Sequence, residues 1–553
     1  MTTRTPTNNL PDEATLAQLA TAMFQQFSGN AAPPHAAAPF SPEHPVAHTG
    51  IPVGTPVTIT AANATLPAEQ MPSAPSFYFL ETGIPRRPAA AAPFELPSPE
   101  AAQLFLDALN VPLPDAAPRH QTLAQPGQRF YFAEHDARAA PLPALPQLDP
   151  IGVRRDFPIL AEKVNGKPLI WFDNAATTHK PQAVIDRIAW FYAHENSNIH
   201  RAAHALAARA TDAYEAAREK VRRFLGAAQI EEIIFVRGTT EAINFVANTW
   251  GEQHIAAGDE ILLSHLEHHA NIVPWQMLAQ RKGAKIKVIP VDDSGQLRLD
   301  ALPGLLNERT KLVALTQVSN ALGTVTPVPE VIALAHAAGA KVLVDGAQAV
   351  SHLRVSVQAL DADFYVFSGH KVFGPTGIGV VYGKRAILET LPPWEGGGNM
   401  IADVTFEHTE YQGVPQRFEA GTGNIADAVG LGAAIDYVEK IGIENIAAYE
   451  HWLLDYATGR LREIPGLRLI GTAAHKASVA SFVIDGYTTV QIGDALSKEG
   501  IAVRSGHHCA QPILRRFGLE ATVRPSLAFY NTCGEVDHMI ATLHKLVRRG
   551  SGV

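Results

Sequence analysis

The stretch KVLVDGAQAVSHLRVSVQALDADFYVFSGHKVFGPTGIGVVYG, residues 341–383, decides the fold. It contains three short runs rich in β-branched and aromatic residues, KVLV, FYVF and IGVVY, and a glycine follows closely after each. Such runs predict buried strands that end in turns. The first strand ends at Asp345, and Lys371 follows the second in the loop SGHKVFGPTG. Because open α/β sheets bind ligands at the carboxyl ends of their strands, we expect a ligand site that contains both residues.

The alternation of strands and helices extends outward, from about residue 156 to about residue 425. The runs EEIIFV, DEILLS and TKLVALT each precede a helical segment, which predicts an α/β fold with a mainly parallel sheet covered on both faces. Longer amphipathic helices and the strand ASVASFVID then predict a smaller C-terminal α+β domain. We therefore expect a large domain at 151–410, whose first residues pack with the small domain, and a small domain at 411–553.

The first 150 residues differ in composition from the rest of the chain. They are rich in alanine and hold 25 of the 40 prolines, no lysine, and 6 arginines against 12 aspartates and glutamates. Because proline lacks a backbone donor and restricts the chain, we expect residues 1–150 to be largely disordered. Two F-Y-F segments, PSFYFLETG and QRFYFAEHD, and two short amphipathic patterns, PDEATLAQLATAMFQQF and SPEAAQLFLDALN, interrupt this extension. They are typical of docking motifs, and the alternative is a spacer without a partner.

The composition of the whole chain excludes several classes of protein. Hydrophobic residues make up 46% of the 553 residues, which is enough to bury a core and excludes a wholly disordered or collagen-like chain. A net charge of −9 disfavours nucleic acid as a partner. No apolar run is long enough to cross a membrane, and two cysteines cannot form a disulfide framework. We expect a soluble, cytoplasmic protein whose ligands are small molecules or other proteins.

Asp345 and Lys371 have the chemistry that pyridoxal 5′-phosphate requires. A carboxylate at a strand end can keep a pyridinium nitrogen protonated, and a lysine in a nearby loop can form a Schiff base. For either residue alone, a solvated charge at a strand end is the simpler explanation. The segment RGTTEAINF favours the cofactor, because it places Thr239 and Thr240 at the start of a helix, where free N–H groups and hydroxyls bind phosphate.

Two further sets of polar residues extend this site. Ser368 and His370 lie close to the lysine and can donate to the same phosphate. The segment SHLEHHANIVPW contributes His265, His268 and His269. A histidine that stacks on a cofactor ring fits this segment better than a metal cluster, because the segment has no cysteine and lacks the spacing of a zinc site. We predict no metal site.

The segment AVRSGHHCAQPILRRFGLEATVRPSLAFYNT carries the candidate nucleophile. Cys509 follows two histidines and lies between two candidate anion-binding residues, Arg504 and Arg524. Cationic surroundings favour a thiolate, so we predict that Cys509 is nucleophilic. Cys533, in NTCGEVDHM, is predicted to be structural.

From about residue 154 to about residue 549 the chain closely resembles the group II, SufS-type cysteine desulfurases. The motifs that carry the resemblance are DNAATTHKP, ENSNIHRAAH, EHHANIVPW, DGAQ, SGHKVFGPTGIG, RFEAGT and RSGHHCAQP. The resemblance implies the type I, aspartate aminotransferase-like fold of pyridoxal phosphate enzymes and an obligate homodimer. It also implies that Lys371 forms the Schiff base, that Asp345 pairs with the pyridine nitrogen, that Gln348 contacts the ring hydroxyl and that His268 stacks on the ring.

The resemblance extends to the phosphate and the substrate. The residues that would hold the phosphate, the last of them from the other subunit, are Thr240, Ser368, His370 and Thr422. Asn320 and Arg524 would orient the substrate carboxylate, and Cys509 would be the nucleophile. The implied reaction converts L-cysteine to L-alanine and leaves the sulfur on Cys509 as a persulfide. The alternatives are a selenocysteine lyase or cysteine sulfinate desulfinase of the same fold, an aminotransferase, and a silent scaffold, which should have lost a key residue.

The extension at residues 1–150 departs from the ordinary SufS-type pattern. It is similar to the leaders of cysteine desulfurases that are packaged as cargo inside encapsulin shells and linked to sulfur storage. This similarity implies an encapsulin shell protein as a partner and a location inside a nanocompartment. The alternatives are a leader that docks a SufE-like sulfur acceptor or folds back on the active site, and a free SufS-type enzyme that feeds iron–sulfur cluster assembly.

Overall fold

The computed structural model of this chain describes residues 148–199 and 203–550. The docking motifs and the disorder expected for residues 1–150 therefore lie outside the described residues, except at positions 148–150. No helix in the two described ranges is long and apolar enough to span a membrane.

The central element is a seven-stranded sheet with the strand order β4-β10-β9-β8-β7-β5-β6. Its strands are β4 (Ile233–Val236), β5 (Glu260–Ser264), β6 (Lys285–Ile289), β7 (Thr310–Thr316), β8 (Lys341–Asp345), β9 (Phe364–Ser368) and β10 (Gly379–Gly383). The strands from β9 to β6 pair in parallel, which confirms the mainly parallel sheet. β10 is antiparallel to both β9 and β4.

The sequence does not predict the antiparallel direction of β10. Residues 369–378, between β9 and β10, form one short 3-10 turn, η6 (Gly369–Lys371), and no helix that crosses the sheet. Parallel neighbours need a crossover connection of about a dozen residues or more, which is usually a helix, whereas antiparallel neighbours can be joined by a direct turn. The chain therefore reverses at the carboxyl end of β9, and this reversal carries Lys371.

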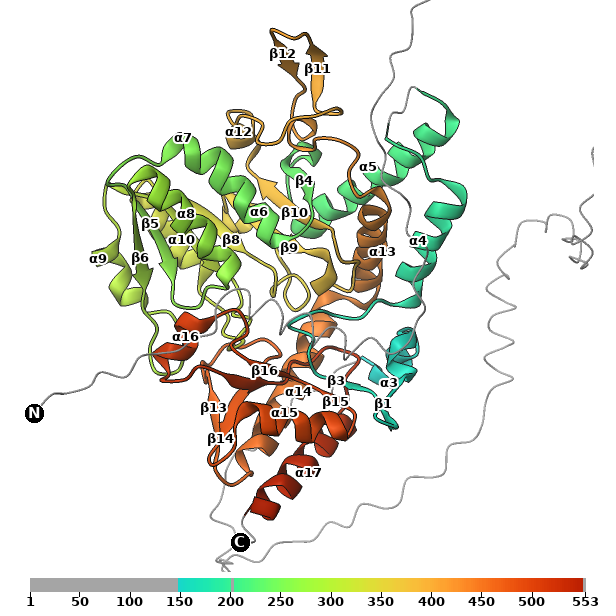
Figure 1. The fold of residues 1–553 in the computed structure, drawn as a ribbon, viewed down its shortest axis with the longest axis vertical. Coiled ribbons are helices and arrows are strands. Elements are labelled where there is room, and N and C mark those ends of the chain that lie inside the picture. Colours follow the sequence, from blue (N-terminus) through green and yellow to red (C-terminus); the bar gives the residue numbers. More distant parts are fainter. Residues whose placement is uncertain (1–147, 200–202, 551–553) are drawn as a thin grey trace, which may run out of the picture. The chain divides into compact units, whose positions relative to one another are not determined.

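Helices cover both faces of this sheet (Figure 1). The covering helices are α5 (Ala205–Leu225), α6 (Thr239–Val246), α8 (Val273–Lys282), α10 (Val328–Ala337) and α13 (Ile425–Ile441). In β8, Val342 and Val344 pack in the core that contains α5, α10 and α13, whereas Leu343 packs in the core that contains α6 and α8. The strands are hydrophobic on both sides because both sides are buried, which confirms the α/β class.

The C-terminal part contains a four-stranded antiparallel sheet with the order β13-β14-β17-β16. Its strands and helices are β13 (Leu467–Ile470), β14 (Ser481–Ile484), β16 (Arg504–Gly506), β17 (Thr522–Arg524), α14 (Ile443–Arg462), α15 (Thr489–Lys498) and α17 (Cys533–Gly550). Figure 1 shows these elements gathered on one side of the larger sheet. This α+β part agrees with the expected fold class, and the limits 151–410 and 411–553 stay predictions.

Two contacts connect the parts of the described chain. β3 (Ile170–Trp171) pairs in parallel with β15 (Ile501–Ala502), so the beginning of the described chain lies beside the C-terminal part. α13 packs against α5 and α4 (Gln182–His194). The C-terminal segment therefore contributes to both parts of the fold.

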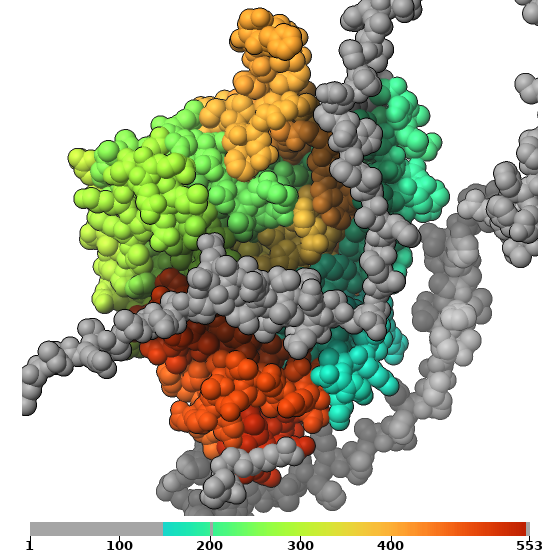
Figure 2. Space-filling view, viewed as in Figure 1, coloured from blue at the N-terminus to red at the C-terminus, as the bar shows by residue number. Residues whose placement is uncertain are grey.

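A hairpin of β11 (Ile401–Val404) and β12 (Thr409–Tyr411) projects from the surface beside the larger sheet (Figure 2). Phe406 in its loop is fully exposed, and Val404 and Tyr411 are exposed as well. The hairpin therefore buries little of its apolar surface against the described residues.

Arg218 of α5 joins three segments near the core. Its guanidinium nitrogen Nη1 lies 2.7 Å from Glu419 Oε1 and 2.8 Å from the carbonyl oxygen of Ile233 in β4. The side chains of Arg218 and Glu419 are 1% and 7% exposed. Because the pair is buried, removing one partner leaves an uncompensated charge in the interior.

We expect Arg218→Met to lower the free energy of unfolding by about 3 kcal/mol, because Glu419 stays buried without its partner. Urea unfolding followed by tryptophan fluorescence measures this change. Arg223→Met on the same helix is the matched control, since Arg223 is 55% exposed and its loss should cost less than about 1 kcal/mol. Equal effects of the two substitutions would contradict this account.

Candidate functional site

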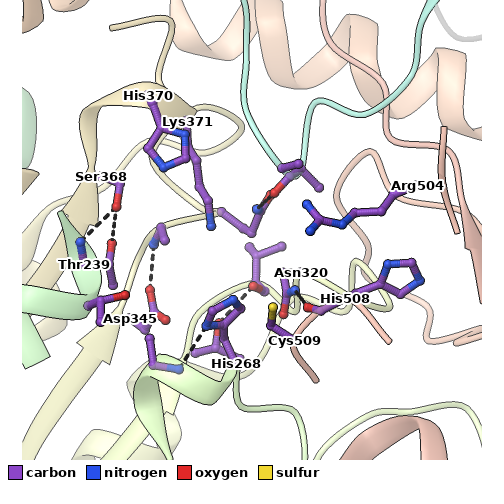
Figure 3. A pocket seen from close by; sticks show the side chains of 18 of the residues that line it. Thr239, His268, Asn320, Asp345, Ser368, His370, Lys371, Arg504, His508 and Cys509 are labelled. Carbon is purple, nitrogen blue, oxygen red and sulfur yellow. Dashed lines mark hydrogen bonds between the residues drawn. The ribbon is translucent and has the colours of Figure 1, made fainter. Parts of the chain in front are cut away.

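A cavity of about 260 Å³ lies at the carboxyl edge of the seven-stranded sheet. Its walls include the last residues of β7, β8 and β9, which are Thr316, Asp345 and Ser368. The second sheet contributes Arg504 and Arg524, so the cavity lies between the two sheets. In Figure 3, Lys371 and Cys509 reach toward the same space from opposite sides.

His265 and His269 do not line the cavity, which brings together most of the residues proposed for the site. These residues are Thr239, Thr240, His268, Asn320, Asp345, Gln348, Ser368, His370, Lys371, Arg504, Cys509 and Arg524. Thr422 instead lines a different cavity, beside Phe418 and Glu419. Because Thr422 is expected to act in the other subunit of a dimer, a position outside its own chain's cavity is compatible with that role.

Asp345 and Lys371 form the electrostatic centre of the cavity. Asp345 is 4% exposed, and its Oδ1 accepts a hydrogen bond of 2.9 Å from the backbone N–H of Ala347. Burial raises the pKa of Asp345, and the nearby charge of Lys371 opposes this rise. Burial lowers the pKa of Lys371, and Asp345 opposes that fall. A lysine with a lowered pKa yields the neutral amine more readily, which is the form that attacks an aldehyde.

His268 lies on the wall of the cavity in a neutral form. Its Nδ1 accepts a hydrogen bond of 3.0 Å from the backbone N–H of Ala270. Because Nδ1 accepts, the proton of the neutral ring is on Nε2. Burial, assisted by the charge of Lys371, lowers the pKa of His268 to about 3. The ring can therefore approach an aromatic cofactor without bringing a positive charge.

Polar groups converge at the start of α6. The backbone N–H of Thr239 lies 2.9 Å from Ser368 Oγ, and the hydroxyls of these residues lie 2.8 Å apart. A Cβ at Gly379 would lie 2.5 Å from Gly238 Cα, so this close approach of two backbones requires glycine at position 379. His370 Nδ1 lies 3.2 Å from Thr177 Oγ1. Hydroxyls, an imidazole and a helix N-terminus together fit a phosphate group.

The backbone around Cys509 is strained and firmly held. His508 and Cys509 have φ values of 54° and 53°, in the left-handed region that non-glycine residues rarely adopt. Asn320 Nδ2 donates to the carbonyl oxygen of His508 at 2.7 Å, and the backbone N–H of His269 donates to that of Cys509 at 2.8 Å. Such strain persists only where the surroundings determine the conformation. The loops that follow β5 and β7 thus hold the backbone that carries the thiol.

Arg524 presents a buried cation to the cavity. It is 1% exposed, and its Nη2 lies 2.9 Å from Asp173 Oδ1, while its Nη1 donates to the carbonyl oxygen of Asn320 at 2.8 Å. Arg524 Nε and His508 Nδ1 are buried without a hydrogen-bond partner in the described part of the chain. Because a buried donor without a partner is costly, Arg524 Nε leaves scope for an anionic ligand.

The histidines of the segment SHLEHHANIVPW contact other residues of the described chain. The ring of His269 lies 5.8 Å from that of His507, nearly parallel to it, and His507 Nδ1 accepts from the backbone N–H of Cys509 at 3.0 Å. Residues 148–199 and 203–550 contain no group of three or more His, Cys, Asp or Glu side chains that could hold a metal ion.

Sequence reasoning missed His508, which lines the cavity, and Asp173, which pairs with Arg524. Asp173 is the first residue of the motif DNAATTHKP, and the motif alone does not indicate what Asp173 does. Its pairing with Arg524 joins two residues far apart in the chain. His508 was visible only as a neighbour of Cys509, and its ring Nε2 lies 2.8 Å from Thr522 Oγ1. Both contacts depend on tertiary structure that local patterns do not indicate.

Comparisons with known proteins show the family to which the chain belongs. Residues 170–539 match the family model for aminotransferase class-V. The chain is 69% identical over 394 residues to a cysteine desulfurase of Synechococcus elongatus, an alignment that covers 71% of this chain and 63% of the relative. It is 58% identical over 475 residues to a probable cysteine desulfurase of Mycolicibacterium paratuberculosis, covering 85% of this chain and 67% of the relative. This chain belongs to the cysteine desulfurases of the class-V aminotransferase family.

A solved structure supports the same cysteine desulfurase fold. The crystal structure of the Escherichia coli cysteine desulfurase CsdA is 40% identical, covers 72% of this chain and 98% of that chain, and has a TM-score of 0.68. The expected type I fold is thereby confirmed. The chain spans 63% of the length of the Synechococcus cysteine desulfurase, so that relative carries further residues that this alignment does not include.

The buried histidines of this cysteine desulfurase homologue predict a loss of stability in acid. Burial, assisted by the charges of Arg524 and Arg504, lowers the pKa of His508 to about 2, and the pKa of His370 is lowered to about 4. The unfolded chain binds protons on these rings below a pH of about 6.5, whereas the folded chain does not. The free energy of unfolding should therefore fall as the pH drops from about 6.5 toward 4, by about 1.4 kcal/mol per pH unit for each ring.

We expect His508→Gln to remove one such contribution, because glutamine does not titrate and can still bond to Thr522. Urea unfolding at several pH values measures the slope, which should become shallower by about 1.4 kcal/mol per pH unit. Asn445→Gln, at an exposed position of α14, exchanges two side chains that do not titrate, so it is the control and should leave the slope as in the wild type. An unchanged slope for His508→Gln would contradict the assigned state of His508.

Proposed function

We propose that this chain is a pyridoxal phosphate-dependent cysteine desulfurase of the SufS type. It converts L-cysteine to L-alanine and receives the sulfur on Cys509. The observation that carries this proposal is the single cavity lined by Lys371, Asp345 and Cys509. The cofactor pair alone would fit many enzymes of the fold, whereas a thiol in the same cavity fits transfer of sulfur.

The cavity residues fit the cofactor. Lys371 would hold it as a Schiff base, Asp345 would pair with its pyridine nitrogen, Gln348 would contact its ring hydroxyl, and His268 would lie against its ring. When bound, pyridoxal phosphate supplies an electron sink that allows bonds next to the substrate's amino group to break. Asp345 maintains this property because its buried carboxylate favours a protonated nitrogen beside it.

The phosphate and the substrate use separate groups. Phosphate is held by polar side chains of α6 and of the segment around Lys371, and in a homodimer by the other subunit: Thr239, Thr240, Ser368, His370 and Thr422. Arg524, Arg504 and Asn320 bind the carboxylate of L-cysteine. Two of these residues are already fixed, since Arg524 is paired with Asp173 and Asn320 is bonded to His508. The substrate therefore meets preorganised groups.

The protein's own groups perform the transfer. Lys371 Nζ removes the proton from Cα of L-cysteine and later returns a proton to the product. Cys509 Sγ, as a thiolate, attacks the substrate sulfur, so that an S–S bond forms while the substrate's C–S bond breaks. The electron pair of the C–S bond stays with the carbon, which takes up a proton to give L-alanine. The products are L-alanine and a persulfide on Cys509, which balances the atoms and electrons of the reactants.

We expect Cys509→Ala to abolish formation of L-alanine from L-cysteine while the absorbance of the bound cofactor remains. Cys533→Ala is the matched control and should retain activity, because Cys533 does not line the cavity. Lys371→Ala should lose the cofactor absorbance itself. Alanine formation by Cys509→Ala at the wild-type rate would overturn the assignment of the nucleophile, and a normal absorbance spectrum for Lys371→Ala would overturn the Schiff base.

We also propose that residues 1–150 form a targeting segment that loads the enzyme into an encapsulin shell. The enzyme itself then has domains at 151–410 and 411–553. The alignment of 475 residues with the Mycolicibacterium relative is longer than the segment 151–553, so part of the extension is shared with that relative. Sharing favours a function for the extension over an incidental spacer. Several short motifs on one chain would bind a shell interior through avidity.

Co-expression with a candidate shell protein from the same genome tests this targeting. We expect the full-length chain to elute with the shell in size-exclusion chromatography, and the 151–553 truncation to elute as a free, active homodimer. Loading of the truncation to the same extent as the full chain would contradict the targeting role. Binding of a SufE-like acceptor to residues 1–150, without loading, would favour a docking role instead.

A further inference from the structure

Glu267 is a completely buried carboxyl group directly before His268. Its Oε1 accepts from the backbone N–H of Thr316 at 3.0 Å and contacts the hydroxyl of Ser264. Its Oε2 accepts from Asn271 Nδ2 at 2.6 Å. Burial raises the pKa of Glu267 to about 8, and the hydrogen bonds from Ser264 and Asn271 oppose this rise. A group that is costly to bury is thus satisfied by three fixed partners.

The orientation of Asn271 is determined by its second partner. Trp275 Nε1 can only donate, and it donates to Asn271 Oδ1 at 2.8 Å. Asn271 must therefore present its NH₂ group to Glu267. Both Asn271 and Trp275 are fully buried, so no water competes for these groups. The network specifies one arrangement, in which Glu267 accepts from opposite sides.

This network connects the two elements that face the cofactor. Thr316 is the last residue of β7 and lies opposite Asp345 in the register of β7 and β8. His268 follows Glu267 in the chain and lies in the same cavity as Asp345. The bond from Thr316 to Glu267 thus joins the loop of His268 to the strand that neighbours Asp345. We propose that Glu267 is a positioning residue that fixes the separation of His268 and Asp345 across the cofactor ring.

Glu267→Gln tests this role, because glutamine has the same shape but an NH₂ group in place of one oxygen. In one orientation that NH₂ group faces the N–H of Thr316, and in the other it faces the NH₂ group of Asn271. In each orientation two hydrogen-bond donors therefore face each other, and neither has an acceptor there. The double substitution Glu267→Gln with Asn271→Asp removes the conflict, since the introduced carboxylate can accept both from the introduced amide and from Trp275 Nε1.

The experiment uses the full-length, cofactor-loaded protein and rests on the proposed function only for its kinetic readout. The second readout is the visible circular dichroism of the bound cofactor, which reports how the ring is held without any turnover. We expect Glu267→Gln to weaken this signal and to lower kcat about tenfold or more, with a smaller change in KM. The double variant should recover both to within about threefold of the wild type. Glu330→Gln, at an exposed position of α10, is the control and should change neither.

Two results would overturn the positioning role. One is a Glu267→Gln variant with wild-type circular dichroism and kcat. The other is a folded double variant whose circular dichroism remains altered, which tests the proposal even where the single variant does not fold. Failure of the proposed function itself is recognised separately, because the wild-type chain would then fail to release sulfur from L-cysteine.

Discussion

The interaction on which the rest of the site depends is that between Asp345 and Lys371 at the carboxyl edge of the parallel sheet. Each group would lose its charge on burial, and each opposes the shift in the pKa of the other. The parallel strands bring Asp345 to this edge, and the chain reversal between β9 and β10 places Lys371 there as well. The fold thereby places in one cavity a carboxyl group whose pKa is raised and an amine whose pKa is lowered. A pyridoxal phosphate site requires an acid and an amine close together.

The second sheet adds the groups that the proposed sulfur transfer requires. It supplies Arg524, the loop after β16 carries Cys509, and loops that follow strands of the larger sheet hold both segments. The carbonyl oxygens of His508 and Cys509 are bound by Asn320 and by the backbone of His269. The thiol thus occupies a strained but determined position opposite Lys371. Contacts within the protein therefore set the positions of the thiol and of the Arg524 cation in the cavity.

The sequence was sufficient to predict the α/β fold and the position of Asp345, because strand ends and helix starts leave local patterns of hydrophobic residues and glycines. It did not predict the direction of β10, which depends on the absence of a crossover helix between residues 369 and 378. Nor did it reveal that Glu267 and Asp173 hold residues that line the cavity. Their partners, Thr316 and Arg524, are remote in the chain, and such pairings arise only when the sheet forms.

The most direct test of the central claim is to locate the sulfur on the protein. The full-length, cofactor-loaded chain is incubated with L-cysteine, its thiols are trapped by alkylation, and its peptides are analysed by mass spectrometry. The account predicts one additional sulfur atom on the peptide that contains Cys509, in step with the L-alanine released. Release of L-alanine with no additional sulfur on Cys509, or with the sulfur on Cys533, would contradict it.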